Sequence, residues 1–218
     1  MPTANFFIGG RSVKINRMEI LAATKNSGKV REIEELLGDL PITLRSLKDF
    51  KNVDEPEETG LNFVENAALK AKYYAARTGL RALADDSGLE VEALGGAPGI
   101  FSARYAGTGA SDAERIKKLL SEINNTGDEN RFARFVCAVA FADERGKIIH
   151  TAEGVCNGKI AFAARGATGF GYDPIFIPEG FSQTFGELSG FEKRQISHRA
   201  RAVKKIISFL TRFYRGLI

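Results

Sequence analysis

The order of apolar and polar residues along the chain predicts interleaved strands and helices. Short apolar runs bounded by polar residues are typical of buried strands, whereas apolar residues that recur every three or four positions predict helices. In chain order, strands are predicted at Met18–Ala23, Ile42–Leu47 and Arg81–Ala84, and helices at residues 28–38, after Gly60 through about Arg77, and at 111–123.

The second half of the chain predicts a long hairpin and a final helix. Apolar and small residues alternate through Arg131–Ala142, and Lys147–Lys159 is expected to pair with this strand across the turn at 143–146. A long amphipathic helix is marked by Val203, Ile206, Ile207, Leu210, Phe213 and Leu217. Interleaved helices and strands with one long hairpin predict a mixed α/β fold.

Length and composition bound the architecture. With 218 residues and 44% hydrophobic content, the chain is expected to form one globular domain or two closely packed lobes. No linker, repeat or low-complexity tract divides it, and no apolar run is long enough for a membrane span or a signal-peptide core. Because Met18 opens a clean strand, we interpret residues 1–17 as an optional leader, disordered or non-native, and residues 18–218 as the domain.

Charge and cysteine content narrow the function classes. The net charge of +4 indicates an anionic partner, and without an arginine-rich tail nucleotide phosphates are as good a target as nucleic acid. Cys137 and Cys156 lie in apolar runs and are expected to be buried free thiols in a reducing cytoplasm. Two histidines and no Gly-x-Ser-x-Gly elbow argue against a hydrolase triad, and no Cys/His cluster indicates zinc.

Candidate chemistry begins where the apolar run at Arg81–Ala84 stops at Asp85, Asp86, Ser87 and Gly88. A strand end would deliver both carboxylates to a cleft, and hard oxygen ligands suit Mg²⁺. The alternative is a solvated hairpin turn. Glu58 supplies a further carboxylate shortly before a helix, where its other interpretation is a charge that favours the helix N-terminus.

A second candidate segment opens the first helix, where a strand gives way to Thr24, Lys25, Asn26, Ser27, Gly28 and Lys29. Backbone N–H groups at a helix start, with two lysines and a hydroxyl, form a cradle for phosphate. The segment is not a Walker P-loop, because the glycine and Ser/Thr positions of that motif are missing. The alternative is an ordinary helix start capped by Asn26 or Ser27.

Two later segments offer groups for recognition. The first is glycine-rich and contains Phe170, Gly171, Tyr172 and Asp173. Its two aromatic rings offer faces for stacking and its carboxylate offers a hydrogen-bond acceptor. The alternative is a glycine-rich turn whose aromatic rings belong to the core. The second, after Ser189, carries Lys193, His198 and Arg199 before the last helix. Positive charge at a helix start opposes the dipole, which indicates an anionic or polar ligand.

These segments, in this order, resemble the inosine triphosphate pyrophosphatase family, also called XTP/dITP diphosphatases. The resemblance runs from about Met18 to the final helix. The matching segments are Ala23-Thr24-Lys25-Asn26 with Lys29, Glu58-Thr59-Gly60 through Glu65-Asn66-Ala67, Ala84-Asp85-Asp86-Ser87-Gly88-Leu89, Leu94-Gly95-Gly96-Ala97-Pro98-Gly99 to Ser102-Ala103-Arg104-Tyr105, Gly169-Phe170-Gly171-Tyr172-Asp173-Pro174 and Ile196-Ser197-His198-Arg199.

The resemblance implies an elongated mixed sheet with flanking helices, two lobes around a cleft, and a homodimer. It implies Mg²⁺-dependent hydrolysis of ITP, dITP and XTP to the monophosphate and pyrophosphate, which clears deaminated purine nucleotides from the cytoplasm. It implies neither a nucleic-acid partner nor a membrane partner. By this resemblance, Thr24–Lys29 would hold the phosphates, and Glu58 and Asp86 would be the Mg²⁺ ligands. Asp86 would also orient or deprotonate the attacking water, and Asp85 would be an auxiliary ligand. The implied substrate contacts are Ser87, Phe170–Asp173 and Lys193 around base and sugar, and His198 with Arg199 at the base edge.

Two departures and two rival hypotheses accompany the resemblance. The run Gly190-Phe191-Glu192-Lys193-Arg194 replaces the commoner Pro-x-Glu-Lys-Asn, and Gly186 stands where alanine is usual. One rival is a pyrophosphatase for pyrimidine or otherwise modified nucleotides. The other is a non-catalytic nucleotide- or RNA-binding module, which the acidic Glu58 and Asp86 argue against because anion binding gains nothing from clustered acids.

Overall fold

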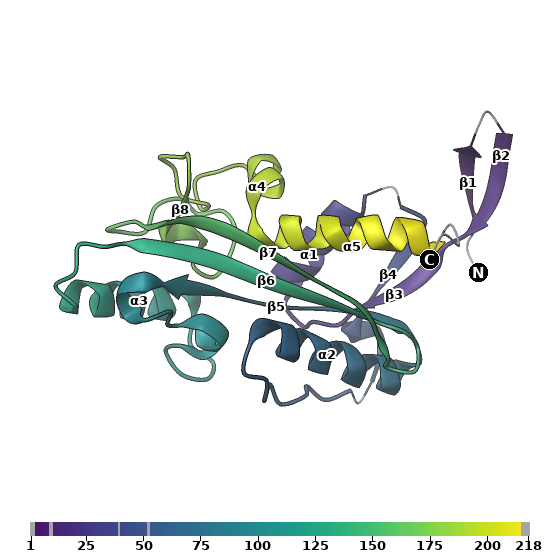
Figure 1. Cartoon of the computed structure of the whole chain (residues 1–218), viewed down its shortest axis with the longest axis horizontal. Helices are drawn as coiled ribbons and strands as arrows, with labels where there is room; N and C mark the ends of the chain where they lie inside the picture. Colours follow the sequence, from purple (N-terminus) through teal and green to yellow (C-terminus); the bar gives the residue numbers. More distant parts are fainter. Residues whose placement is uncertain (1–2, 9–10, 39, 52, 215–218) are drawn as a thin grey trace.

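A computed structural model of the chain describes residues 3–8, 11–38, 40–51 and 53–214. Its main feature is a curled six-stranded mixed sheet of order β4-β3-β5-β6-β7-β8 (Figure 1). The strands are β3 Met18–Ala22, β4 Ile42–Ser46, β5 Arg81–Val91, β6 Phe132–Ala142, β7 Ile148–Ile160 and β8 Phe176–Pro178. β3 runs parallel to β4 and β5, and the remaining neighbours are antiparallel.

The helices and a separate hairpin complete the described chain. The α-helices are α1 Ser27–Leu37, α2 Phe63–Thr78, α3 Asp112–Asn125, α4 Gly190–Ile196 and α5 His198–Tyr214. Short 3₁₀ turns are η1 Leu47–Asp49, η2 Glu92–Leu94, η3 Gly99–Arg104 and η4 Asp173–Ile175. β1 Thr3–Ile8 and β2 Arg11–Asn16 pair as an antiparallel hairpin that projects from the body in Figure 1.

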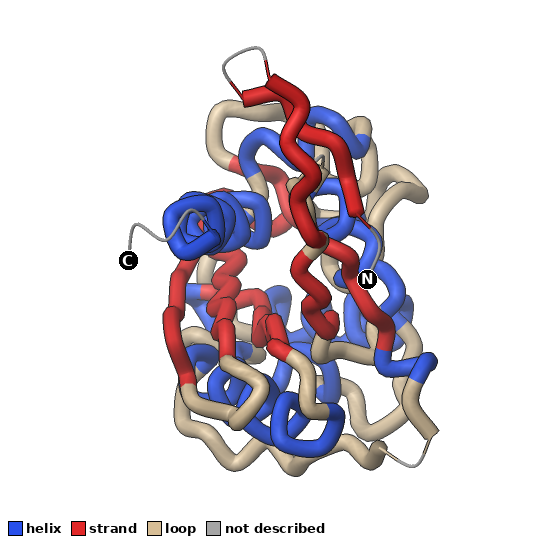
Figure 2. The backbone as a smooth tube through the Cα atoms, turned by 90° about the vertical axis from the view of Figure 1, so that its right-hand side faces the viewer, coloured by secondary structure: helices blue, strands red, loops and turns tan. Residues whose placement is uncertain are grey.

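Helices cover both faces of the sheet. α1 and α5 lie on one face, where Ile33 and Ile206 join a core with Leu83 and Val139 of the strands. α2 covers the other face, where Ala67 and its neighbours pack on β5 and β6 (Figures 1 and 2). The small residues of α2 let the helix lie close to the sheet, as the alanine spacing predicts.

A third core fills the far end of the long strands. There α3 packs its Leu119 and Ile123 against Leu89 of β5, together with Phe176 and Phe185 beside β8. Because β5, β6 and β7 each extend over 11 residues or more, one continuous sheet carries both ends of the molecule. The mixed α/β class and the elongated sheet predicted from the sequence are confirmed.

Most predicted elements are confirmed, and two predictions are wrong. The strand at Arg81 does not stop at Ala84 but continues to Val91, so the acidic pair lies within a strand and not at its end. The segment after Ser189, predicted to precede the last helix, contains the separate helix α4, which Ser189 caps, and the last helix α5 already begins at His198. Leu217, assigned to the last helix, lies outside the described residues.

The strand extends past Ala84 because its residues pair with β6 as far as Val91. Asp85, Asp86 and Ser87 pair in register with Val139, Ala138 and Cys137 of β6. The tertiary ladder therefore overrides the turn-forming preference of Asp-Asp-Ser-Gly. Among the described residues, no helix combines the length and the apolar character that a membrane span requires.

Candidate active site

A cavity of about 740 Å³ lies where α1, β5, α4 and α5 meet the glycine-rich loop 166–174. All the residues that the sequence places in the site, with the exception of Asp85, line this cavity: Thr24, Lys25, Asn26, Ser27, Gly28, Lys29, Glu58, Asp86, Ser87, Phe170, Gly171, Tyr172, Asp173, Lys193, His198 and Arg199. A second cavity of similar volume, at the far ends of β5 and β7, contains none of them. The fold therefore gathers segments that are widely separated in the chain.

Asp86 occupies the wall of this cavity beside a buried lysine. Lys70 Nζ, from α2, donates to Asp86 Oδ1 at 2.8 Å and to Glu58 Oε1 at 2.9 Å. Arg104 Nη1 donates to the other Glu58 oxygen at 3.0 Å. Burial would raise the pKa of Glu58, but the charges and hydrogen bonds of Lys70 and Arg104 outweigh it and lower that pKa. Burial raises the pKa of Asp86.

The donor set at Glu58 and Asp86 fits a small divalent cation. Asp86 Oδ2 is buried and has no hydrogen-bond partner in the part of the chain that the structure describes. In that same part, no group of three or more His, Cys, Asp or Glu residues is arranged to hold a metal. Two carboxylates are nevertheless enough for Mg²⁺, which in nucleotide enzymes takes its other ligands from water and phosphate.

Asp85 belongs to a different environment from Asp86. Its Oδ2 lies 3.1 Å from Lys29 Nζ and 3.2 Å from Arg199 Nε, and its side chain is completely buried. Burial would raise the pKa of Asp85, but the charges of Lys29 and Arg199 hold it well below its ordinary value. Asp85 Oδ1 is buried and has no hydrogen-bond partner among the described residues, so the auxiliary role that the resemblance implies for Asp85 stays a prediction.

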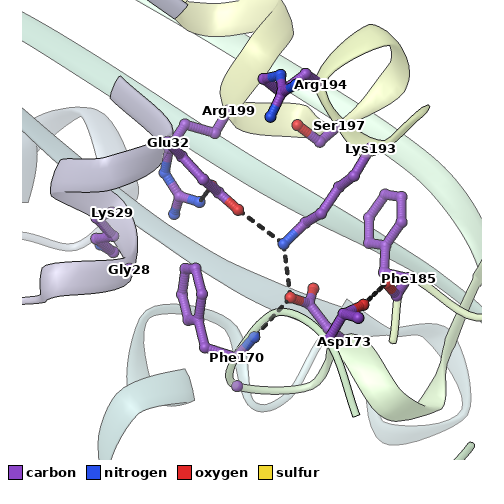
Figure 3. A network of polar contacts seen from close by, with 12 residues as sticks. Gly28, Lys29, Glu32, Phe170, Asp173, Phe185, Lys193, Arg194, Ser197 and Arg199 are labelled. Carbon is purple, nitrogen blue, oxygen red and sulfur yellow. Dashed lines mark hydrogen bonds and ion pairs between the residues drawn. The ribbon is translucent and has the colours of Figure 1, made fainter. Parts of the chain in front are cut away.

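An ion network extends from Asp85 through Arg199 to the glycine-rich loop. Figure 3 shows its part from Glu32 through Lys193 to Asp173. Arg199 also pairs with Glu32 of α1, and Lys193 Nζ joins Glu32 Oε1 at 2.8 Å to Asp173 Oδ2 at 2.6 Å. Although burial alone would lower the pKa of Lys193, its two carboxylate partners raise it. Lys193 thus stays charged, and the network ties α1, α4, α5 and the loop together across the cavity.

The start of α1 combines both interpretations of Thr24–Lys29. Asn26 caps the helix, since its Oδ1 accepts from the N–H groups of Gly28 at 2.9 Å and Lys29 at 3.1 Å. These two N–H groups are therefore engaged, and the side chains of Lys25, Ser27 and Lys29 are what the segment presents to the cavity. A Cβ on Gly28 would lie 2.7 Å from the Phe170 ring, so glycine is required where the ring meets the helix.

The two rings of the glycine-rich loop play different parts. Phe170 is partly exposed, with Lys193 Nζ 5.0 Å and Arg199 Cζ 5.5 Å from its ring centre. Tyr172 is buried in the core under α3, and its hydroxyl donates to Ser102 O at 3.0 Å. Phe170 therefore offers a ring face to the cavity, whereas Tyr172 anchors the loop.

His198 is buried at the start of α5 and stacks on Phe135, with ring centres 4.5 Å apart. Its Nδ1 is buried and has no hydrogen-bond partner among the described residues. Burial and the charges of Arg199 and Lys193 lower the pKa of His198 well below its ordinary value. The imidazole is therefore neutral at pH 7, with one nitrogen that donates and one that accepts.

Comparison with known proteins decides the family. A model described as the Ham1 family matches residues 20–209 of this chain. The chain belongs to the Ham1 family. It is 47% identical over 196 residues to a protein of Exiguobacterium sibiricum named dITP/XTP pyrophosphatase, covering 90% of this chain and 98% of that protein. A protein of the same name from Desulforamulus reducens is 47% identical over 197 residues, with the same coverage.

Solved Ham1 structures have the same fold. The HAM1 protein from Coxiella burnetii superposes with a TM-score of 0.82 and 46% identity, covering 89% of this chain and 98% of that one. The Ham1 protein of Staphylococcus aureus gives a TM-score of 0.78 and 39% identity, covering 88% and 98%. The resemblance drawn from the sequence motifs is thereby confirmed for the family and for the fold.

Among the charged residues of this Ham1 cavity that sequence analysis missed are Lys70 and Glu32. Lys70 lies three residues after Ala67 and four before Tyr74, on the buried face of α2, where a lysine demands a partner. Glu32 lies three residues after Lys29 on α1 and so shares its face. Helical spacing from residues already assigned could have indicated both positions, but their partners come from other segments.

Proposed function

We propose that this Ham1-family chain is a nucleoside-triphosphate pyrophosphatase. It would hydrolyse non-standard purine triphosphates (dITP, XTP and ITP) to the monophosphate and pyrophosphate and so remove deaminated purines from the nucleotide pool. The names of its relatives support dITP and XTP as substrates. The observation that carries the proposal is Asp86 Oδ2, which is buried in the wall of the cavity and has no hydrogen-bond partner among the described residues; neutral His198, whose Nδ1 likewise has none there, lines the same cavity.

Glu58 and Asp86 would hold Mg²⁺, because both line the cavity, Lys70 Nζ holds them next to one another, and Asp86 Oδ2 has no hydrogen-bond partner among the described residues. A bound Mg²⁺ supplies positive charge to the phosphate oxygens and lowers the pKa of water. Lys70 keeps the two carboxylates close to one another. Burial would lower its pKa, but the charges of Asp86, Asp85 and Glu58 raise it, so Lys70 is positively charged at neutral pH.

The reacting end of the substrate would lie between Asp86 and the start of α1. Asp86 Oδ2, free of protein partners in the described chain, would orient the attacking water and accept its proton. Lys25 and Lys29 would offset the negative charge that develops on the leaving pyrophosphate. Ser87, whose hydroxyl accepts from Arg199 Nη2 at 2.8 Å, would contact the substrate between these two groups.

The base would lie at the other end of the cavity, against Phe170. Stacking on such a ring contributes roughly 1–3 kcal/mol in single-strand nucleic-acid binders. Neutral His198 can donate to the 6-carbonyl of hypoxanthine or xanthine, together with Arg199, whereas the 6-amino group of adenine would meet another donor. A site built around a hydrogen bond discriminates strongly because its polar groups are otherwise left unpaired.

Turnover of a substrate panel tests the proposal. Purified protein is incubated with ITP, dITP, XTP, ATP, GTP and dTTP, with and without Mg²⁺, and pyrophosphate is resolved from orthophosphate. Pyrophosphate from dITP, XTP and ITP, and only with Mg²⁺, is the expected result. Preference for pyrimidine or other modified nucleotides would overturn the base-recognition argument, and nucleotide binding without turnover would favour the binding-module hypothesis.

Three further expectations remain predictions. A homodimer is expected, which sedimentation equilibrium measures directly. A cytoplasmic location is expected for an enzyme of the nucleotide pool. No nucleic-acid partner is expected, and a gel-shift titration with RNA and DNA tests that point.

A further inference from the structure

The tip of the glycine-rich loop is attached to α3 by one carboxylate. Gly171 N–H donates to Asp112 Oδ2 at 2.6 Å, a contact between residues 59 positions apart. Asp112 is the first residue of α3 and was not among the site residues predicted from the sequence. Gly171 has φ +62°, so the loop turns sharply where this bond is made.

Asp112 is itself held in place. Its Oδ1 forms an ion pair with Arg115, one turn further along α3. Arg115 Nη1 also donates to Ala110 O at 2.5 Å and to Ala103 O at 3.0 Å. Both carboxylate oxygens therefore already have protein donors, and the carboxylate has a defined position before any ligand binds.

The neighbouring N–H of the loop tip is fixed in the same way. Phe170 N–H donates to Asp173 Oδ2 at 2.8 Å, but Asp173 lies within the same loop. Asp112 is thus the carboxylate that ties the tip to another element. Hydrogen bonds of this type, from N–H to an ionised acceptor, are about twice as strong as neutral ones.

The same segment is attached to the strand that carries Asp86. Ser102 of η3 accepts from Leu89 N through Oγ at 2.9 Å, and its carbonyl accepts from the Tyr172 hydroxyl. At Gly88 the strand lies so close to η3 that a Cβ would be 2.4 Å from Gly99 O. Residues 99–115 therefore connect the acidic strand to the loop that carries Phe170.

We infer that Asp112 is a positioning residue for base recognition, which sets where the Phe170 ring stands relative to Asp86 and Ser87. The inference rests on the proposed function, because it assumes that the base stacks on Phe170. Asp112 acts through the Gly171 N–H and not on the substrate. Loss of its carboxylate should therefore weaken binding of the base while leaving the pyrophosphate end of the cavity unchanged.

Calorimetric titration with two separate ligands tests this inference. Inosine monophosphate tests the part of the cavity that would bind the base, and inorganic pyrophosphate with Mg²⁺ tests the part that would bind the leaving group. We expect Asp112→Ala to raise the Kd for inosine monophosphate roughly ten-fold, the cost of one charge-assisted hydrogen bond, and to leave the Kd for pyrophosphate unchanged. Asp112→Asn keeps an acceptor for Gly171 N–H and should lose several-fold, which is less than alanine.

Glu114→Ala is the matched control. Glu114 lies in the same first turn of α3, where it closes the capping box with Ser111, and in the described part of the chain no hydrogen bond or ion pair joins it to the loop. Both alanine variants should unfold at lower urea concentration, but only Asp112→Ala should lose affinity for inosine monophosphate. Equal affinity in Asp112→Ala and the wild type, or equal losses in both variants, would overturn the inference.

The outcomes separate this inference from the proposed function. A wild type that binds neither ligand contradicts the proposed function, and the inference falls with it. A wild type that binds both, with unchanged affinities in the Asp112 variants, contradicts the inference alone. If Asp112→Ala does not fold, the Kd for inosine monophosphate is compared between Asp112→Asn and its control Glu114→Gln. Equal Kd values in these two variants and the wild type would overturn the inference.

Discussion

Asp85 and Asp86 are adjacent in the chain, but their carboxylates lie on opposite faces of the central sheet. Asp85 Oδ2 is 3.1 Å from Lys29 Nζ on the face covered by α1 and α5, whereas Asp86 Oδ1 is 2.8 Å from Lys70 Nζ on the face covered by α2. Successive side chains of a strand point to opposite faces, so an extended backbone through both residues separates them. One carboxylate consequently serves the ion network and the other the cavity wall.

Asp85→Asn is expected to cost mainly stability. The substitution takes the Asp85 charge away from Lys29 and from buried Arg199, which keeps its pair with Glu32, and breaking such a buried pair costs about 3–5 kcal/mol. Urea unfolding followed by circular dichroism measures this cost. Glu144→Gln, which breaks the partly exposed pair with Arg81, should change stability little. Similar costs for the two variants would contradict the structural role of Asp85.

Asp86→Asn is expected to remove turnover and to preserve the fold. The amide cannot accept the proton of the attacking water, and loss of a general base costs roughly 10²–10⁴-fold in rate. Pyrophosphate release from dITP should therefore fall by that factor, while inosine monophosphate still binds. Wild-type turnover in this variant would exclude the role assigned to Asp86.

Glu58→Gln is expected to weaken Mg²⁺ binding, measured by titration calorimetry without nucleotide. Loss of a residue that only supports a metal ligand lowers metal affinity roughly 10-fold. Loss of one of the two proposed ligands should therefore lower the Mg²⁺ affinity by more than that. Glu57→Gln is the control, since Glu57 is the exposed neighbour in the chain and does not line the cavity. Equal Mg²⁺ affinities in the two variants would argue against the site.

His198 predicts a loss of stability as the pH falls. Its folded-state pKa lies well below the unfolded value of about 6.5, so between these two values only the unfolded state binds the proton. Stability from this group is present above about pH 6.5 and falls by up to about 1.4 kcal/mol per pH unit below it. Urea unfolding of wild type and His198→Gln between pH 7.5 and 5 measures the difference, which should shrink as the pH falls. A constant difference would show that the imidazole titrates alike in both states.

Gly154→Ala is expected to disturb base recognition through the position of α5. A Cβ at Gly154 of β7 would lie 2.1 Å from His198 O and 2.5 Å from Ala202 N, so the start of the helix must move. Overpacking of this kind costs about 1–3 kcal/mol. The ratio of kcat/KM for ITP to that for ATP should change, because His198 and Arg199 move with the helix.

Gly158→Ala is the matched control for that prediction. It lies on the same strand, and its Cβ would meet Ile177 O at 2.3 Å, away from the cavity. It should lower stability without changing the selectivity ratio. A change of equal size in both variants would mean that selectivity responds to stability alone.

Local sequence signals were sufficient for most elements. The alternation of residues in β6 and β7 and the spacing of alanines in α2 have the periods of a strand and a helix. The structure confirms these elements because their buried residues recur with the same periods. The end of the strand at Ala84 was wrong because turn propensity describes a segment without neighbours, whereas β6 pairs along all of β5. The charged partners Lys70 and Glu32 were missed for a related reason, since each contacts residues of other segments.

The sequence by itself determined the family, the α/β class and the motif residues that line the cavity, because these depend on motifs and on local periodicity. Tertiary structure alone decided which carboxylate serves which role. The face on which a side chain lies depends on how far the strand continues, and that length is set by hydrogen bonds to β6. The tertiary structure also decided that Tyr172 anchors the loop and that Asp112 holds it, since contacts between distant segments exist only once the chain has folded.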